Sequence, residues 1–215
     1  MNRNDAFHGV YLVTGDCPRH PLEKVVAEAA NAGLCCVQLR EKTADTRTFL
    51  DRALRLKALL APLNIPFIIN DRVDIALAAG ADGVHIGQSD MPYEKARQLM
   101  GPDAVIGLSV ETWEDVTAAE ALDLAYIGIS PVFATPTKTD TKTPWGLDGV
   151  ARIKAYSRHT LVAIGGLNPD NVPEVVRAGA DAAAVVSAIC SAEDPKQATT
   201  RLNQSFKAGL FRPVF

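Results

Sequence analysis

The chain of 215 residues is 47% hydrophobic and 22% charged, and its formal net charge at pH 7 is −3. This length and apolar content predict one domain with one large core, and the 22 basic residues form no long run, which argues against nucleic acid and membranes as partners. No apolar stretch approaches the roughly 18 residues of a membrane span. The first ten residues also lack the apolar core of a signal peptide, so we expect a cytoplasmic protein.

Apolar runs and turn residues predict strands and helices that alternate along the first half of the chain. We expect strands at 10–14, 36–40, 67–69 and 83–87, helices at 21–32 and 45–60, and a short third helix whose end is at 76–79. Asp45 is expected to cap the second of these helices. Gly80 is expected to close the third, because glycine readily takes the left-handed conformation of a C-terminal cap.

The second half continues the alternation around one long loop. We expect strands at 104–110, 125–130, 161–166 and 183–189, and helices at 92–100, 113–122, 147–156, 168–177 and 195–206. The loop between them, residues 131–146, is rich in threonine and proline. A loop of this length in a compact domain is typical of a functional lid or of disorder.

Eight nearly all-apolar strands that alternate with eight helices predict an α/β fold with a covered parallel sheet. We therefore predict a single (β/α)8 TIM barrel over residues 1–215, with an N-terminal arm at 1–8 and a C-terminal tail at 207–215 whose packing the pattern does not indicate. The repeated cadence of residues 78–87 and 177–186 fits a barrel built from like units. An open doubly wound sheet is the alternative, but no G-x-G-x-x-G motif follows the first strand.

The four cysteines, at positions 17, 35, 36 and 190, have no C-x-x-C spacing and no histidine cluster beside them. Neither a zinc site nor a disulfide framework is predicted, and we interpret them as buried or idle thiols. His85 stands inside a predicted strand, so we interpret it as a core or supporting histidine rather than a general base.

Two carboxylates, Asp71 and Asp90, follow the ends of two successive predicted strands. If the strands are parallel members of one sheet, both side chains emerge at the same edge, where they could share a divalent cation. Either aspartate alone is better explained as the cap of the following helix. Two such exits in succession favour a metal or phosphate site.

Other polar residues follow the remaining strands at the same predicted end of the barrel, where TIM-barrel chemistry takes place. They are Gln38, Arg40, Lys42, Asn70, Ser109, Thr135, Thr137 and Lys138. Gly165-Gly166 and Val186-Ser187 end the last two strands and are suited to a phosphate cradle of backbone N–H groups. This charge pattern suits a diphosphate on one side and a monophosphate on the other, although each threonine or serine could instead serve a turn or a cap, and Arg40 or Lys42 a surface ion pair.

Seven short motifs occur in register with one known family. They are QLREK (38–42), IND (69–71), GVHIGQSD (83–90), GLS (107–109), TPTK (135–138), IGG (164–166) and VVSAI (185–189). In these motifs the chain resembles the thiamin phosphate synthase family from about Gly9 to the last helix. The resemblance implies a barrel that joins 4-amino-2-methyl-5-hydroxymethylpyrimidine diphosphate to 4-methyl-5-(2-phosphoethyl)thiazole, with Mg²⁺ as cofactor. Pyrophosphate would leave first, and the thiazole nitrogen would then attack the pyrimidine cation.

The resemblance also implies the roles of individual residues. Asp71 and Asp90 would bind Mg²⁺, and Arg40, Lys42, Ser109 and Lys138 would act in catalysis. The pyrimidine diphosphate would contact Gln38, Leu39, Arg40, Glu41, Lys42, Asn70, Ser109 and Lys138. The thiazole phosphate would contact Thr135, Pro136, Thr137, Gly166, Val186 and Ser187. Whether Lys138 or Lys142 closes on the diphosphate stays open, as does assembly into a homo-oligomer.

Three other functions compete with synthesis of thiamin phosphate. A thiazole tautomerase on the same barrel would, as its family pattern implies, use a histidine near the end of strand six, and residues 128–133 contain none. A Schiff-base aldolase would use Lys42, whose neighbours Arg40 and Glu41 make a desolvated lysine doubtful. A non-catalytic barrel that binds a phosphorylated metabolite would not need the two aspartates.

Overall fold

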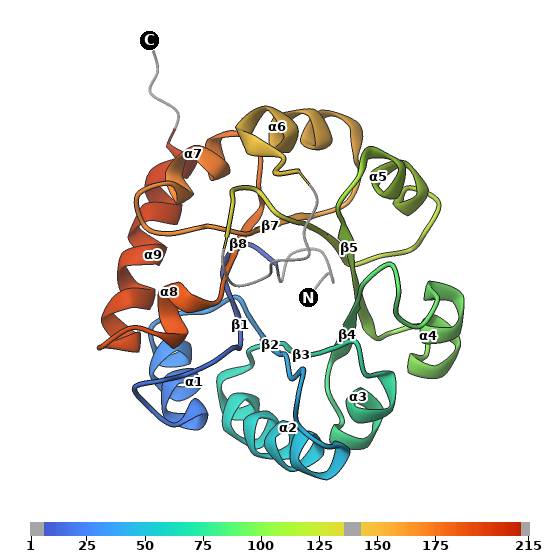
Figure 1. The fold of residues 1–215 in the computed structure, drawn as a ribbon, viewed down its shortest axis with the longest axis vertical. Coiled ribbons are helices and arrows are strands. Elements are labelled where there is room, and N and C mark those ends of the chain that lie inside the picture. Colours follow the sequence, from blue (N-terminus) through green and yellow to red (C-terminus); the bar gives the residue numbers. More distant parts are fainter. Residues whose placement is uncertain (1–6, 136–142, 212–215) are drawn as a thin grey trace.

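Eight parallel strands close into a barrel in the computed structural model, which describes residues 7–135 and 143–211. The strands follow one another around the barrel in chain order, and β8 returns to pair with β1. Helices form a ring around them (Figure 1). The predicted (β/α)8 TIM barrel is therefore confirmed. No helix within the described ranges combines the length and the apolar character that crossing a membrane requires.

The strands are short and are buried along nearly their whole length. They are β1 Gly9–Val13, β2 Cys36–Leu39, β3 Phe67–Asn70, β4 Gly83–Ile86, β5 Val105–Val110, β6 Tyr126–Ile129, β7 Leu161–Ile164 and β8 Ala182–Val185. Burial on both faces explains why these strands appear in the sequence as continuous apolar runs and do not alternate with polar residues.

The helices cover the outside of the barrel. They are α1 Leu22–Asn31, α2 Thr46–Leu60, α3 Val73–Ala79, α4 Tyr93–Met100, α5 Trp113–Ala119, α6 Gly146–Tyr156, α7 Val172–Arg177, α8 Ser187–Cys190 and α9 Pro195–Leu210, with a 3₁₀ turn η2 at Ala61–Leu63. Asp45 caps α2 by accepting the Thr48 N–H, and Gly80 ends α3 with φ 61°. Both predicted caps are confirmed.

Two predicted boundaries differ from the structure near the C-terminus. The strand predicted at 183–189 ends at Val185, and Ser187–Cys190 forms helix α8. A short apolar run does not distinguish a buried strand from a buried helical turn, which explains the error. The last helix was predicted to end at Phe206, but α9 continues to Leu210 and buries Gly209. Part of the predicted tail is thus helix.

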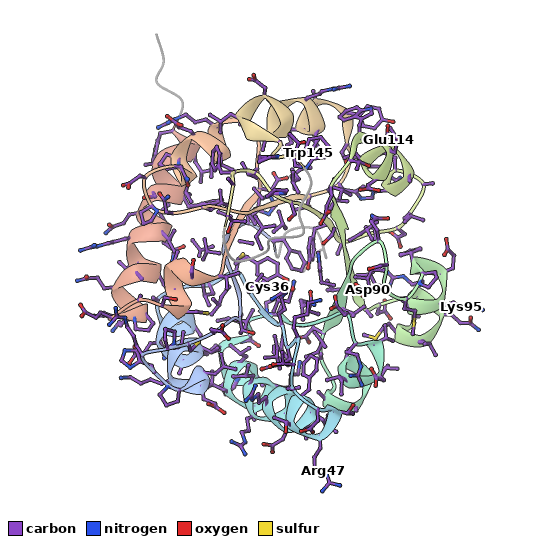
Figure 2. All side chains as sticks on the ribbon, in the orientation of Figure 1. Cys36, Arg47, Asp90, Lys95, Glu114 and Trp145 are labelled. Carbon is purple, nitrogen blue, oxygen red and sulfur yellow. The ribbon has the colours of Figure 1, made fainter. Side chains whose placement is uncertain are left out.

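The buried side chains form two layers that the strands separate. The larger layer lies between the sheet and the helices, and the smaller one fills the barrel interior with Phe7, Tyr11 and Tyr126 at its centre. Phe7 belongs to the predicted N-terminal arm, yet it is fully buried. Figure 2 shows the charged side chains of Arg47, Lys95 and Glu114 pointing away from the ring of helices. The aromatic filling leaves the carboxyl ends of the strands as the place for a polar site.

Candidate active site

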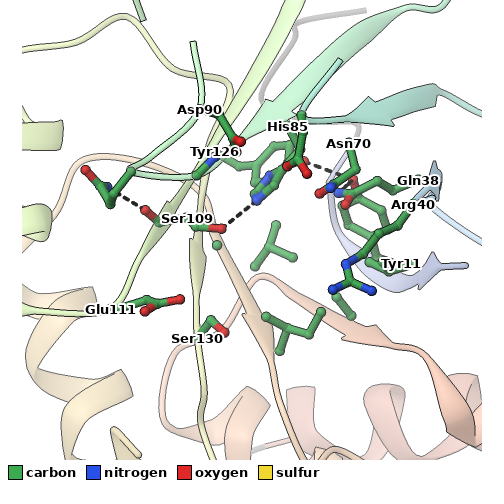
Figure 3. A pocket seen from close by; sticks show the side chains of 18 of the residues that line it. Tyr11, Gln38, Arg40, Asn70, His85, Asp90, Ser109, Glu111, Tyr126 and Ser130 are labelled. Atoms are coloured by element: carbon green, nitrogen blue, oxygen red, sulfur yellow. Dashed lines mark hydrogen bonds between the residues drawn. The ribbon is translucent and has the colours of Figure 1, made fainter. Parts of the chain in front are cut away.

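A cavity of about 550 Å³ lies at the carboxyl ends of the strands (Figure 3). Most of the polar side chains predicted from the strand exits line it. They are Gln38, Arg40, Lys42, Asn70, Asp71, Asp90 and Ser109. Tyr11, His85, Glu111, Tyr126 and Ser130 line the same cavity without having been predicted to do so. We call it the large cavity, because it is larger than the cavity that adjoins it; a separate outer cavity is larger still.

Asp71 and Asp90 come together at the rim of the large cavity. Asp71 has a left-handed backbone (φ 64°) and its N–H donates to the His85 carbonyl over 2.8 Å, which ties the exit of β3 to β4. The Asp90 carboxylate accepts the Gly87 N–H over 2.6 Å. Partial burial raises the pKa of Asp90, and the neighbouring Asp71 carboxylate raises it further. The rim therefore concentrates negative charge on two interacting side chains.

This pair of carboxylates fits a magnesium ion. Mg²⁺ is usually held by one or two carboxylates together with water and substrate phosphates, and a dedicated protein cage is uncommon. The residues that the structure describes contain no cluster of three acidic, histidine or cysteine side chains suited to a metal, so the rim has the two carboxylates alone. Lys42 Nζ lies 2.6 Å from Asp71 Oδ2. The Lys42 ammonium group thus already balances the negative charge of the Asp71 carboxylate, as a metal ion would.

A chain of hydrogen bonds crosses the floor of the large cavity. Gln38 Nε2 donates to Tyr11 Oη over 2.9 Å, and Tyr11 Oη lies 2.9 Å from Tyr126 Oη. His85 bridges Tyr126 Oη (3.0 Å from Nδ1) and Ser109 Oγ (2.8 Å from Nε2). Burial raises the pKa of both tyrosines well above the usual value, so both phenols stay protonated.

Gln38 fixes one donor in this chain, because its Nε2 donates to Tyr11 Oη. The other three hydrogen bonds can run in either direction, since a phenol, a serine hydroxyl and a neutral imidazole each donate and accept. When they continue the direction that Gln38 sets, His85 carries its proton on Nε2 and donates to Ser109 Oγ, and the Ser109 O–H donates into the cavity. In that arrangement the floor offers a hydrogen-bond donor suited to a ring nitrogen or another acceptor.

Two glycines give the aromatic rings of the floor their space. A Cβ at Gly107, which pairs with Tyr126 across β5 and β6, would lie 2.2 Å from Tyr126 Cζ. A Cβ at Gly128 would lie 3.1 Å from His85 Cε1. The small residues in β5 and β6 therefore position the hydrogen-bond chain.

A second cavity of about 340 Å³ adjoins the first, and we call it the small cavity. Its lining includes Thr135, Gly166, Val186 and Ser187, which the sequence grouped as a phosphate site. Gly166 has φ 67°, and a Cβ there would lie 2.8 Å from the Ala134 carbonyl oxygen, so glycine is needed for this close approach. The first N–H groups of α8 have no acceptor within the helix and begin at this cavity.

Arg40 lines both cavities and also the outer cavity of about 1010 Å³. Within residues 7–135 and 143–211, no carboxylate forms an ion pair with its guanidinium, whereas Lys42 is paired with Asp71. An arginine with no carboxylate partner between two cavities is suited to bind an anionic ligand from either side. This shared wall makes the two cavities one site with two compartments.

Some predicted site residues do not face either cavity. Leu39 is fully buried in the layer between sheet and helices. Glu41 accepts a hydrogen bond from Arg52 on α2 over 2.6 Å and faces a third, outer cavity. Because side chains alternate along a strand, the residues on either side of Arg40 point away from the barrel interior. Pro136, Thr137, Lys138 and Lys142 lie outside the described residues, so their roles stay predictions.

Three of the five cavity residues that the sequence did not indicate share one property, whereas Glu111 and Ser130 directly follow β5 and β6. Tyr11, His85 and Tyr126 lie within strands rather than after them, and their side chains point into the barrel. In an apolar strand such residues resemble ordinary core, so only their inward position could have indicated a role.

Comparison with known proteins relates this chain to one kind of enzyme. Residues 10–189 match the family model described as thiamine monophosphate synthase. The thiamine-phosphate synthase of Albidiferax ferrireducens is 54% identical over 201 residues, which cover 93% of this chain and 92% of that one. That of Leptospira biflexa serovar Patoc is 52% identical over 204 residues, covering 92% and 97%. The solved thiamine phosphate pyrophosphorylase from Pyrococcus furiosus is 36% identical, with a TM-score of 0.87 and coverage of 97% and 99%.

Proposed function

The chain belongs to the thiamine monophosphate synthase family and is a transferase of thiamin biosynthesis, and we propose from this premise how its two cavities divide the reaction. The large cavity binds the hydroxymethylpyrimidine diphosphate, and the small cavity binds the thiazole phosphate. The observation that carries this division is that the two cavities share Arg40 and the wall around it. Two substrates bound in adjoining cavities can react directly with each other, so no covalent enzyme intermediate is needed.

Asp71 and Asp90 would hold Mg²⁺ at the rim of the large cavity. The ion would neutralise negative charge on the diphosphate as it departs. The raised pKa of Asp90 supports this assignment, because two interacting carboxylates are stabilised by a shared cation. Lys42 is then released from Asp71 and becomes available to the diphosphate.

The protein's own side chains bind and orient the pyrimidine diphosphate. Arg40 and Lys42 supply positive charge where the diphosphate develops negative charge, which is the largest kind of contribution in such reactions. Ser109 donates its O–H to the aminopyrimidine ring, held in direction by His85. The aromatic floor beneath them excludes water from the reacting carbon.

Bond changes in this scheme need no protein nucleophile. The C–O bond to the diphosphate breaks and pyrophosphate leaves with the electron pair. The electron-rich aminopyrimidine carries the positive charge, and the lone pair of the thiazole nitrogen forms the new C–N bond. The thiazole phosphate is held meanwhile at Gly166 and at the start of α8, where glycine allows backbone N–H groups to approach it.

The test is pyrophosphate release from the two substrates by wild type, Asp71→Asn and Asp90→Asn, each with and without a chelator. Each substitution removes one negative ligand and keeps the shape, so we expect activity to fall on the order of 10²-fold or more. Asp74→Asn is the matched control, because Asp74 pairs with Arg72 on the exposed face of α3. Full activity in chelator, or in both Asn variants, would overturn the metal assignment.

A further inference from the structure

Two cysteines that are far apart in the sequence meet beside the small cavity. Cys17 lies between β1 and α1, and Cys190 is the last residue of α8. The loop that carries Cys17 lies along the segment that follows Cys190: Arg19 Nε donates to the Ser191 carbonyl over 3.1 Å, and His20 Nε2 lies 2.9 Å from the Glu193 carbonyl oxygen. The two thiols interact closely enough for each to shift the pKa of the other. Both also reach the backbone of Gly15: Cys17 Sγ donates to the Gly15 carbonyl over 3.4 Å, and Cys190 interacts with the same residue. The fold thus creates a dithiol that the spacing in the sequence did not predict.

The two thiols differ in access. Cys17 lines the outer cavity of about 1010 Å³, whereas Cys190 is only 1% exposed. An oxidant that enters the outer cavity therefore meets Cys17 first. Cys190 lies behind it, in the position of a thiol that can only react with its neighbour.

The pKa values of the two thiols also differ, and in the same sense as their access to solvent. The hydrogen bond from Cys190 lowers the pKa of Cys17, although burial, Asp16 and Glu41 oppose the shift. The same hydrogen bond and burial raise the pKa of Cys190. Since the thiolate is the nucleophile, Cys17 is the thiol that reacts and Cys190 the one that resolves.

We propose that Cys17 and Cys190 form a redox-sensitive dithiol that a hydroperoxide oxidises to a disulfide. The Cys17 thiolate attacks the terminal peroxide oxygen, the O–O bond breaks, and hydroxide from hydrogen peroxide, or the alkoxide from an organic hydroperoxide, leaves with the electron pair, so that Cys17 becomes a sulfenic acid. The Cys190 sulfur then attacks the Cys17 sulfur; the S–S bond forms and water leaves. Sulfur has lost two electrons and the peroxide has gained them. A small dithiol restores both thiols by exchange.

Other uses of these cysteines are less consistent with the structure. The described residues contain no group of three metal-binding side chains, so a soft metal site at the pair is not supported. The second pair of cysteines, Cys35 and Cys36, are neighbours in sequence. Burial raises the pKa of Cys35 to about 12 and that of Cys36 well above the usual value. These two stay protonated and serve as an internal control.

The disulfide would act on the small cavity through the loop that Cys17 anchors. This consequence rests on the function proposed above. A Cβ at Gly15 would lie 2.5 Å from Val186 Cγ1, so the loop packs directly on the residue before α8. A disulfide holds its sulfur atoms about 2.05 Å apart, closer than two hydrogen-bonded thiols. Closing that gap shifts the loop against Val186 and Ser187, both of which line the small cavity.

The primary experiment reads the bond itself and needs no substrate. The full chain is treated with hydrogen peroxide, alkylated, digested with trypsin and analysed by mass spectrometry without reduction. We expect a cross-link between peptides 4–19 and 178–196, which contain Cys17 and Cys190, reversed by dithiothreitol. Peptide 25–40, with Cys35 and Cys36, should take part in no cross-link. Cys17→Ser and Cys190→Ala should give no cross-link, and Cys35→Ala should still give it.

The second readout is kinetic. In the oxidised wild type the KM for the thiazole phosphate should rise tenfold or more while the KM for the pyrimidine diphosphate stays unchanged, since a displacement of about 1 Å can cost on the order of 10²-fold. Peroxide should leave Cys17→Ser unchanged. Oxidation of Cys17 to sulfinic acid without a cross-link, or a cross-link through peptide 25–40, would overturn the proposal. If the chain lacked the proposed activity, the cross-link would form all the same, so the two failures are distinguishable.

Discussion

Asp71 lies in a backbone conformation that residues other than glycine adopt rarely, with φ 64°. The Arg72 N–H donates to the Asn70 carbonyl over 2.7 Å, which closes a three-residue turn around Asp71. Strained residues of this kind persist where the surrounding structure holds them, and they concentrate at functional sites. The strain here directs the Asp71 carboxylate toward Asp90, whose own pKa it raises. The two carboxylates thus lie close together at some cost to the fold.

This cost predicts how stability depends on pH. The folded state holds the Asp90 proton more tightly than the unfolded chain, so stability falls as pH rises from the ordinary aspartate range through the raised pKa of Asp90. Without metal, Asp90→Asn should therefore have a higher melting temperature than wild type at pH 7. The difference should disappear at a pH below the ordinary aspartate pKa. Thermal unfolding at both pH values is the measurement.

Asp74→Asn is the control with the opposite sign. The hydrogen-bonded ion pair with Arg72 lowers the pKa of Asp74, so its contribution is present at neutral pH and lost as pH falls through the lowered pKa. Because the pair is exposed, we expect only a small decrease in melting temperature at pH 7. Added Mg²⁺ should stabilise wild type and Asp74→Asn more than Asp90→Asn. A melting temperature of Asp90→Asn below that of wild type at pH 7 without metal would contradict the account.

The sequence could indicate Asp71 and Asp90 because both follow the end of an apolar strand, where packing in the core does not explain a polar residue. It could not indicate His85 as part of the cavity floor. His85 lies within β4, and its role depends on hydrogen bonds to Tyr126 and Ser109 from two other strands. Partners that are distant in the sequence leave no local pattern.

At the scale of elements, the last strand and helices show that packing determines element boundaries that the local sequence pattern does not. The apolar run from 182 to 190 is divided between β8 and α8 by a change of backbone direction at Val186. The same change places Ser187 at the small cavity and Cys190 against Cys17. Helix α9 then covers α7, α1 and β1 and continues four residues past its predicted end. Contacts with α7 account for that extension, and no local sequence pattern predicts these contacts.

Gly209 tests this packing. A Cβ at Gly209 would lie 2.7 Å from Val176 Cβ and 2.8 Å from the Pro173 carbonyl oxygen, both on α7. Gly209→Val should therefore destabilise the protein by about 1–3 kcal/mol through overpacking, although valine has the higher helix propensity. Ala208→Val introduces the same side chain one residue earlier, on the exposed face, and should cost well under 1 kcal/mol. Urea unfolding measures both, and equal losses would show that α9 does not dock tightly on α7.

At the scale of the whole molecule, the barrel was predictable because its signal is repeated eight times. Each β-α unit is ambiguous alone, but the alternation of apolar strands and amphipathic helices leaves few other architectures. The contents of the barrel were not predictable in the same way. Phe7 was assigned to an arm outside the barrel, and the structure buries it completely in the interior. Phe7 precedes the first of the repeated β-α units, so no periodic pattern could identify it as a core residue.

Phe7 packs in the apolar part of the barrel interior, beneath the polar floor of the large cavity. Its ring centroid lies 4.7 Å from that of Tyr126 and 6.2 Å from that of Tyr11, the two residues whose hydroxyl groups begin the hydrogen-bond chain to Ser109. The large cavity above is therefore shaped partly by a residue that does not touch it. Loss of the Phe7 ring should disturb both stability and the cavity floor.

Phe7→Ala should destabilise the protein by about 3–5 kcal/mol, the usual cost of removing a buried phenylalanine and leaving a cavity. Because Tyr126 loses its support, the KM for the pyrimidine diphosphate should rise as well. Leu56→Ala is the matched control: Leu56 is equally buried but lies on α2 in the outer layer, so we expect a loss of about 2–5 kcal/mol without the change in KM. Phe7→Leu should keep most of the stability, since a roughly volume-conserving apolar change costs under about 1.5 kcal/mol. Urea unfolding and pyrophosphate release measure the two effects, and an equal rise in KM in Leu56→Ala would mean that the floor responds to overall stability rather than to Phe7.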